Sequence, residues 1–349
     1  MSNEFEPACR RMEWLDSFYK SVWEKAFADA IPISGTFELT PRCNFNCRMC
    51  YVHLKEEQIP QYGKELTAKE WIHIAEEAKE AGTTWLCITG GEPLMHPKFE
   101  TIWKELSQMG FFMTLQTNAS LIQGKMADLL ERYPPRSVKV TLYGTDDNIY
   151  RDVCQVENGY TRVNAGIQRL KQMKIPVELV STVIRQNQDD VVKMAFYAYI
   201  NKLRWAATGN IRKSVRGADT DVESLRVVED SKVPNGTKIV HDEKKKAVIN
   251  YERKPCTYCR DYRVGYWVLW NGKMSFCSFI NELDISLKEL SFSRAWKQLI
   301  EFEDLLDWPD ECKTCAKREK CVKCAATLAT ECGSVHKVSK EFCDLVMNN

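Results

Sequence analysis

The sequence predicts an α/β fold in which six strand–helix units form a parallel sheet, followed by a smaller cysteine-rich region. Between residues 35 and 207, short runs of β-branched and aromatic residues alternate with helical patterns. The alternation ends near residue 209, and most of the later cysteines gather after residue 255. The 349 residues, 44% of them apolar, suffice for one large domain and a smaller one. Repeated units of this kind predict right-handed crossovers, in either a doubly wound sheet or an open barrel.

The individual elements are predicted in chain order. Residues 12–29 carry apolar side chains at helical spacing, which predicts an amphipathic helix that packs as a lid or brace. A capping box of Thr67 and Glu70 begins a helix at 67–81, and a second helix is predicted at 97–109 with Pro97 in its first turn. The six strands are expected at 36–40, 85–89, 112–117, 138–142, 177–183 and 203–207. In such folds the functional residues lie at the carboxyl ends of the strands.

A polar stretch over residues 209–255 is interpreted as a linker. Its lysine run at 244–246 stands beside two acidic residues, which is typical of a solvated face rather than of a nucleic-acid site. Beyond it, Asn271 and Gly272 separate two β-rich runs and predict a hairpin with a type I′ turn. The expected organisation is an N-terminal helical segment at 1–34, the strand–helix domain at 35–208, the linker at 209–255 and the cysteine-rich domain at 256–349.

Charge and composition exclude several classes of partner. The 49 basic and 48 acidic side chains leave a net charge of +1, which provides no long-range attraction to nucleic acid or an anionic membrane. No apolar stretch is long enough to span a bilayer, and residues 1–14 lack the apolar core of a signal peptide. We therefore expect a cytoplasmic protein that binds neither nucleic acid nor membranes.

The chain contains 15 cysteines. In a protein expected to be cytoplasmic, so many cysteines favour metal or redox chemistry over disulfides. Cys43, Cys47 and Cys50 stand in the loop expected after the first strand. Three closely spaced thiolates can hold an iron–sulfur cubane and leave one of its irons open, whereas an electron-transfer site is normally closed by a fourth cysteine. The alternative is a catalytic zinc site, but no histidine or carboxylate stands at the close spacing that such a site uses.

This triplet, directly after the first strand, resembles the signature of the radical S-adenosylmethionine (SAM) superfamily, in which an aromatic residue such as Tyr51 commonly accompanies the last cysteine. The resemblance covers roughly residues 35–207 and implies a partial (β/α)6 TIM-type barrel. It further implies that the open iron binds the methionine portion of SAM, and that reduction releases a 5′-deoxyadenosyl radical. The protein would orient the cofactor and exclude side reactions.

A cofactor cradle is expected at the ends of the following strands. The sequence from Gly90 to Pro93 resembles the family's GGEP motif, whose paired glycines allow close approach of a ligand and whose carboxylate can accept from an ammonium group. Polar residues at later strand ends resemble positions that contact the ribose and carboxylate. The resemblance thus assigns cofactor contacts to Tyr51, Gly90, Gly91, Glu92, Pro93, Asn118, Thr141, Ser181 and Arg185.

The C-terminal cysteines resemble a SPASM domain, an extension that carries two auxiliary 4Fe–4S clusters and here contains the predicted hairpin. The family's central motif has three residues in its last gap, whereas this chain has two between Cys321 and Cys324. The resemblance assigns the cluster nearer the barrel to Cys256, Cys259, Cys277 and Cys324. It assigns the outer cluster to Cys312, Cys315, Cys321 and Cys343. A zinc ribbon is the alternative for paired cysteines of this spacing.

Four cysteines remain after these assignments. Cys154 lies in the loop expected after the fourth strand and is a candidate hydrogen-atom donor, although a packed loop cysteine is the plainer interpretation. Cys87 is interpreted as a small buried hydrophobe inside the second strand. The sequence leaves the roles of Cys9 and Cys332 open.

A radical SAM enzyme with two auxiliary clusters resembles maturases of ribosomally made peptides, which implies a peptide substrate and an electron donor such as flavodoxin or ferredoxin. The residues before the first strand are too few for a folded leader-binding domain, so a separate partner is expected to bind the leader. The alternatives are a small alcohol or sugar dehydrogenase, a sulfatase-maturing enzyme and a non-enzymatic electron carrier. The sulfatase-maturing reading is weakened because Ser278, not aspartate, follows Cys277.

Overall fold

The computed structural model describes residues 17–227, 254–259, 261–317 and 324–348. Its centre is one nine-stranded sheet with the strand order β6-β5-β4-β3-β2-β1-β7-β8-β9. The first six strands are all parallel, which confirms the predicted α/β fold. Their bounds are β1 (Ser34–Glu38), β2 (Trp85–Thr89), β3 (Phe112–Thr117), β4 (Ser137–Thr141), β5 (Val177–Thr182) and β6 (Arg204–Thr208).

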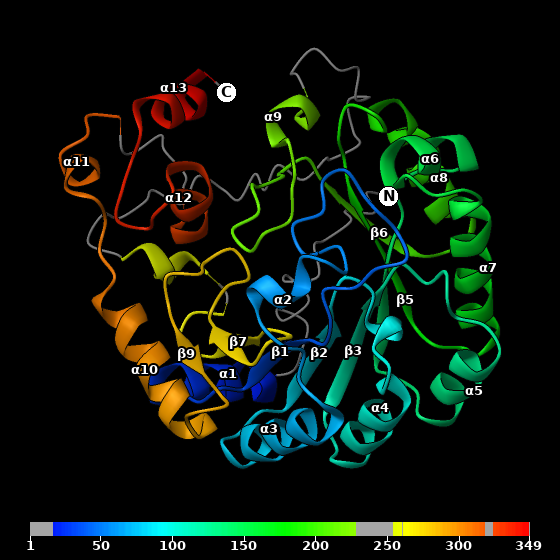
Figure 1. Ribbon diagram of the computed structural model, residues 1–349, viewed down its shortest axis with the longest axis horizontal. Helices are drawn as coiled ribbons and strands as arrows, with labels where there is room; N and C mark the ends of the chain where they lie inside the picture. The colour runs from blue at the N-terminus through cyan, green and yellow to red at the C-terminus, as the bar shows by residue number, and fades with distance from the viewer. Residues whose placement is uncertain (1–16, 228–253, 260, 318–323, 349) are drawn as a thin grey trace.

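Helices cover the outside of the curved parallel sheet (Figure 1). In chain order the helices of this part are α2 (Ile59–Tyr62), α3 (Ala68–Glu80), α4 (Phe99–Gln108), α5 (Lys125–Arg132), α6 (Asp147–Cys154), α7 (Gly159–Gln172) and α8 (Val191–Ile200), with short 3-10 turns η2 (Pro93–Met95) and η3 (Gln188–Asp190). The short α2 is not among the outer helices and lies near the carboxyl ends of β1 and β2 (Figure 1). The capping box of α3 is present, with Thr67 and Glu70 bonded reciprocally. The prediction for α4 is wrong by two residues at its start: Lys98 is the N-cap, so Pro97 precedes the helix instead of lying in its first turn.

The N-terminal helix α1 (Ser17–Asp29) packs at the start of the strands. Its Ala26 and Trp23 contact Ile33, Trp85 and Val264, each at or just before the first residue of a strand. The part of the predicted helix at 12–16 lies outside the described residues. In the described part, α1 therefore serves as a brace at the end of the sheet opposite the cysteine loop.

The C-terminal part extends the same sheet. Strand β7 (Gly265–Val268) pairs in parallel with β1, and β8 (Lys273–Ser275) and β9 (Ile285–Ser286) follow antiparallel. Helices α10 (Phe292–Leu305), α11 (Asp310–Lys313), α12 (Ala325–Cys332) and α13 (Lys340–Asn348) stand beside this end of the sheet (Figure 1), and the short α9 (Val222–Leu225) and η4 (Pro255–Tyr258) precede β7 in the chain. The barrel and the cysteine-rich region are thus joined by main-chain hydrogen bonds between β1 and β7.

The hairpin of β7 and β8 is confirmed, but its turn is not type I′. Among the two turn residues only Gly272 has a positive φ, of 88°, whereas a type I′ turn needs positive φ at both. The Gly272 N–H donates to the Leu269 carbonyl, and the Leu269 N–H to the Lys273 carbonyl. The connection therefore has three residues, with glycine in the left-handed position that such loops require.

Candidate active site

The loop that carries Cys43, Cys47 and Cys50 follows β1 and is held by the turn after β2. The Gly91 N–H donates to the Thr40 carbonyl and the Glu92 N–H to the Arg42 carbonyl, both at 2.7 Å. A Cβ at Gly91 would lie 2.4 Å from the Arg42 oxygen, and one at Gly90 would lie 2.8 Å from the Thr40 oxygen. The close neighbour that requires these glycines is therefore the cysteine loop itself.

The carboxyl end of α6 holds the other side of the loop. The Asn46 N–H donates to the Cys154 carbonyl at 3.0 Å, and the Arg48 N–H donates to the Val153 carbonyl at 2.9 Å. The Arg48 Nε also donates to the Asp152 carbonyl at 2.6 Å. The last carbonyls of a helix have no partner within the helix, so α6 offers acceptors that fix the residues on both sides of Cys47.

The three sulfurs lie close enough to affect one another. Burial, the charge of Glu92 and the neighbouring thiols raise the pKa of Cys43, and burial together with Cys47 raises the pKa of Cys50 to about 11. N–H groups already point at two of the sulfurs: Phe45 donates to Cys43 at 3.4 Å and His53 to Cys50 at 3.2 Å. As thiolates, these buried sulfurs would repel one another. Iron ions of a shared cluster would offset that repulsion, and the N–H donors stabilise the sulfurs further, so the arrangement fits a cluster site.

Cys154 lies against this triplet. The prediction that it lies in a loop is wrong, because Cys154 is the last residue of α6, where its side chain is fully buried. A hydrogen bond between the two thiols, together with burial, raises the pKa of Cys47. The thiol predicted as a hydrogen donor is thus in contact with a candidate cluster ligand.

Glu92 links the ends of β2 and β3. Its Oε1 accepts from the Leu94 N–H at 3.1 Å, its Oε2 accepts from the Asn118 N–H at 2.8 Å, and the Thr117 hydroxyl lies 2.8 Å from both oxygens. Burial raises the pKa of Glu92 to about 7 against the lowering effect of these donors. The carboxylate therefore orders the protein around the cysteine loop in addition to any contact with a ligand.

The other predicted cradle residues differ in how directly they adjoin the triplet. Asn118 donates to Asn44 at 2.9 Å and lies 3.9 Å from the Cys43 sulfur. Thr141 ends β4 and is half-buried, and Pro93 is buried at the start of η2. Ser181 and Arg185 lie further along the sheet.

The structure commits Ser181 and Arg185 to contacts within the protein. The Ser181 hydroxyl donates to the Leu142 carbonyl and accepts from the Trp205 indole at 2.8 Å. The Arg185 Nε donates to the Arg226 carbonyl at 2.7 Å. Both side chains therefore stabilise the β5–β6 end of the fold, and their cofactor contacts stay a prediction.

The structure brings together the four cysteines that the sequence assigns to the nearer auxiliary cluster. Burial, Glu303 and the other three thiols raise the pKa of Cys256. Burial is also the main factor that raises the pKa of Cys259 to about 12 and of Cys277 to about 11. No three Cys, His, Asp or Glu side chains in the described ranges are placed to hold a single metal ion, whereas the thiolates of a cubane bind different irons.

Cys324 differs from its three partners. Burial would raise its pKa, but the positive charge of Arg212 and hydrogen bonds from Thr327 lower the pKa below its ordinary value. The sulfur lies 3.3 Å from the Thr327 hydroxyl, at the N-terminus of α12. A helix N-terminus favours a thiolate, so this position suits a ligand.

The outer cysteine set is described only in part, because Cys321 lies outside the described residues. Cys312 is buried in a small cluster with Trp308, Leu328 and Phe342, the neighbour of Cys343. Cys332, whose role the sequence left open, packs against the same cluster. Cys315 is half-buried three residues beyond Cys312.

Sequence reasoning missed a buried ion pair beside the first cysteine loop. Glu38 ends β1 with its side chain 1% exposed, and Arg216 meets it from the polar stretch with both terminal nitrogens, at 2.5 and 2.9 Å. The Arg216 guanidinium also lies over the Tyr51 ring, 5.8 Å from its centroid. An acidic residue inside the first predicted strand, 36–40, was the one signal in the sequence for this pair.

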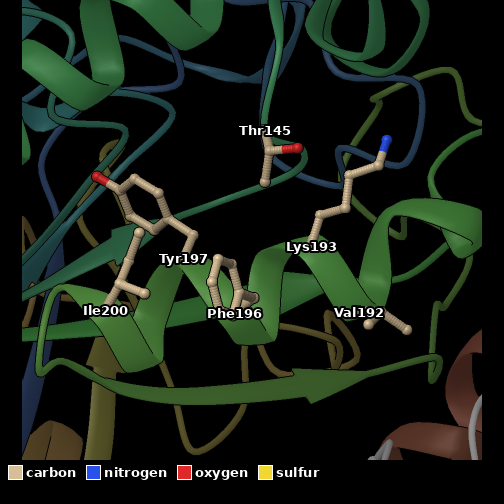
Figure 2. A pocket seen from close by; sticks show the side chains of 6 residues that line it. All are labelled: Thr145, Val192, Lys193, Phe196, Tyr197 and Ile200. Atoms are coloured by element: carbon tan, nitrogen blue, oxygen red, sulfur yellow. The ribbon is translucent and has the colours of Figure 1, made fainter.

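An open hollow of about 480 Å³ lies over α8, and its lining includes no residue of either cysteine site. Figure 2 shows Val192, Phe196 and Ile200 along the helix, with Tyr197 and Thr145 above them. No predicted site residue lines it. No helix in the described ranges is long and apolar enough to cross a membrane.

Comparisons with known proteins agree with this geometry. Over 322 residues the chain is 24% identical to the AdoMet-dependent heme synthase of Methanosarcina barkeri, covering 83% of this chain and 90% of that protein. It is 25% identical over 201 residues to the sporulation killing factor maturation protein SkfB of Bacillus subtilis, covering 56% of this chain but 48% of the relative. The crystal structure of Streptococcus suis SuiB bound to the precursor peptide SuiA matches with a TM-score of 0.65 at 17% identity, covering 98% of this chain and 83% of that one.

The family comparison falls on the part of the chain that holds the first site. Residues 37–198, which run from β1 to α8, match the sequence profile of the Radical SAM superfamily. This range contains the cysteine triplet, the glycine turn and Glu92, all gathered at the carboxyl ends of β1, β2 and β3. Residues 37–198 of this chain therefore belong to the radical SAM superfamily.

Proposed function

We propose that this radical SAM enzyme removes a hydrogen atom from a peptide and so matures a ribosomally made precursor by cross-linking, epimerisation or oxidation. One observation carries the proposal: a second cysteine set gathers beside β1, in a fold shared over 98% of the chain with a protein bound to its precursor peptide. The relative SkfB is likewise named as a maturation protein.

The proposed cofactors are SAM and three 4Fe–4S clusters. Superfamily membership implies SAM and the cluster at Cys43, Cys47 and Cys50, which together supply the 5′-deoxyadenosyl radical when bound. The proposal also includes the two auxiliary clusters, so that the C-terminal cysteines hold iron–sulfur clusters instead of zinc. It includes the contacts between SAM and the cradle residues as well. Within it, the Glu92 network and the α6 carbonyls keep the triplet in one geometry.

Two partners complete the proposal. A one-electron donor such as flavodoxin or ferredoxin reduces the first cluster, and a separate protein binds the leader of the precursor. The electron donor is required by the reductive cleavage of SAM, and the leader-binding protein is part of the peptide hypothesis.

A second candidate is a reaction on a small molecule. The alignment with the heme synthase covers more of both chains than that with SkfB. This relationship favours a precursor of heme as the alternative substrate.

Deuterium transfer distinguishes the two candidates. The reduced enzyme, supplied with SAM, is incubated separately with two kinds of substrate. The first is a set of short peptides encoded beside its gene, prepared with deuterium on the α carbons and the side-chain carbons, and the second is a set of heme precursors. We expect deuterium in the 5′-deoxyadenosine and a mass change in one peptide, because the abstracted atom moves to the 5′ carbon. Deuterium transfer from no peptide, together with turnover of a heme precursor, would establish the second candidate instead.

A further inference from the structure

Residues 210–220, which we call the strap, lie between the two cysteine sites. The Thr220 hydroxyl donates to the Cys50 carbonyl at 2.5 Å, and the Ser214 hydroxyl donates to the Tyr51 carbonyl at 3.1 Å. From the other side, the Asn281 side chain donates to the Val215 carbonyl at 2.6 Å. The strap is thus fixed both to the first cysteine loop and to the segment after Cys277.

One arginine of the strap reaches the second cysteine set. The Arg212 Nη2 lies 3.7 Å from the Cys324 sulfur, within hydrogen-bond distance of sulfur. Its guanidinium stacks over the Phe279 ring, 5.3 Å from the centroid, and Phe279 in turn packs on Tyr51 with ring centroids 4.3 Å apart. The stacking fixes the plane of the guanidinium, and the cation acts on both Cys277 and Cys324.

A second N–H donor of the same guanidinium lacks an acceptor. The Arg212 Nε is buried and has no hydrogen-bond acceptor among the residues that the structure describes. A buried donor without an acceptor loses the hydrogen bond that it would make with water, so a site that retains one normally supplies an acceptor. A cluster bound by the neighbouring cysteines brings sulfide and thiolate sulfurs, which accept such bonds.

We propose that Arg212 is a positioning residue of the nearer auxiliary cluster, where it donates N–H groups to the cluster's sulfurs and raises its reduction potential. The inference rests on the proposed ligand set of Cys256, Cys259, Cys277 and Cys324. A cubane closed by four thiolates carries net negative charge, and one-electron reduction increases it. Hydrogen bonds to sulfur and a nearby cation therefore favour the reduced state.

The test is a potentiometric titration of the reconstituted full-length chain, followed by electron paramagnetic resonance. The Cys43→Ala, Cys47→Ala, Cys50→Ala background removes the first cluster, and the signal that Cys277→Ser abolishes identifies the nearer auxiliary cluster. In this background Arg212→Gln should lower the midpoint potential by about 59 mV, a tenfold change in the reduced-to-oxidised ratio for one electron. Arg212→Lys, which keeps the charge but loses the planar fork, should give a smaller decrease in the same direction.

Lys213→Gln is the matched control. Its side chain is 46% exposed and pairs with Glu223, so removal of the same charge one residue away should leave the potential unchanged. If Arg212→Gln loses the auxiliary iron, the test rests on Arg212→Lys. The inference then requires that this variant keep the cluster and show a lowered midpoint potential. An unchanged potential in both Arg212 variants, or an equal decrease in Lys213→Gln, overturns the inference while the cofactor set stands. If Cys277→Ser abolishes no signal, the cofactor set itself fails, and the inference fails with it.

Discussion

At the scale of single residues, the Glu38–Arg216 pair decides whether the strap stays on the barrel. The Glu38 side chain is buried and that of Arg216 is only 10% exposed, and the two-pronged contact joins the end of β1 to the segment that also contacts Cys50 and Tyr51. Removal of one member of a buried pair leaves the other charge without a partner, which costs about 3–5 kcal/mol. Removal of both leaves no buried charge.

We therefore expect Glu38→Gln and Arg216→Gln each to lower the free energy of unfolding by about 3–5 kcal/mol, and the double variant to lower it by much less than their sum. Urea denaturation of the apoprotein measures all three. Lys273→Gln with Asp284→Asn is the control, because that pair is 48% and 84% exposed and its loss should not be detectable. Additive single effects at Glu38 and Arg216 would show that the contact contributes nothing of its own.

At the scale of elements, the carboxyl end of α6 and the following Gln155 hold the first cluster loop through their oxygens, and we expect the Cys154 side chain not to be needed for that task. Asn46→Ala with Arg48→Ala removes two side-chain hydrogen bonds to residues 152–155, worth about 1 kcal/mol each. We expect this double variant to lose iron from the first cluster to a chelator roughly thirtyfold faster than the wild type, because the two bonds together are worth about 2 kcal/mol. Cys154→Ala should lose iron at the wild-type rate.

The same Cys154→Ala variant tests the hydrogen-donor hypothesis. If the thiol donates to a substrate radical, the variant should still release 5′-deoxyadenosine but should form no finished product. Normal product from Cys154→Ala would show that the cysteine is a packing residue. Rapid loss of iron from Cys154→Ala would instead show that its contact with Cys47, and not the helix carbonyls, holds the loop.

Regular elements could be predicted from the sequence, because alternating apolar strands and helical stripes are local patterns. The expected bounds of β2 and β3 match the structure, and the four cysteines assigned to the nearer cluster do meet. The strap could not be predicted, because irregular backbone has no periodicity and the Glu38–Arg216 pair joins positions 178 residues apart. The turn type at Asn271 was wrong for a related reason: the length of the loop is set by the pairing of Leu269 with Lys273, which the dipeptide alone does not specify.

At the scale of the whole molecule, one continuous sheet carries both cysteine sites, because β7 pairs with β1 directly ahead of the first cysteine loop. The β6 end carries α8 and its exposed apolar side chains, and the β9 end carries the helices of the outer cysteine set (Figure 1). This arrangement places the nearer auxiliary set beside the barrel. A protein of this design should hold three separate clusters.

The most direct test of that account is the iron and sulfide content of the anaerobically reconstituted chain, measured together with dithionite-dependent release of 5′-deoxyadenosine. The wild type and Cys87→Ala, a change in β2 outside all three sets, should hold about twelve irons and release the nucleoside. The Cys43→Ala, Cys47→Ala, Cys50→Ala variant should hold about four fewer and release none. Zinc in place of iron, or equal release of the nucleoside by the triple variant, would contradict the account.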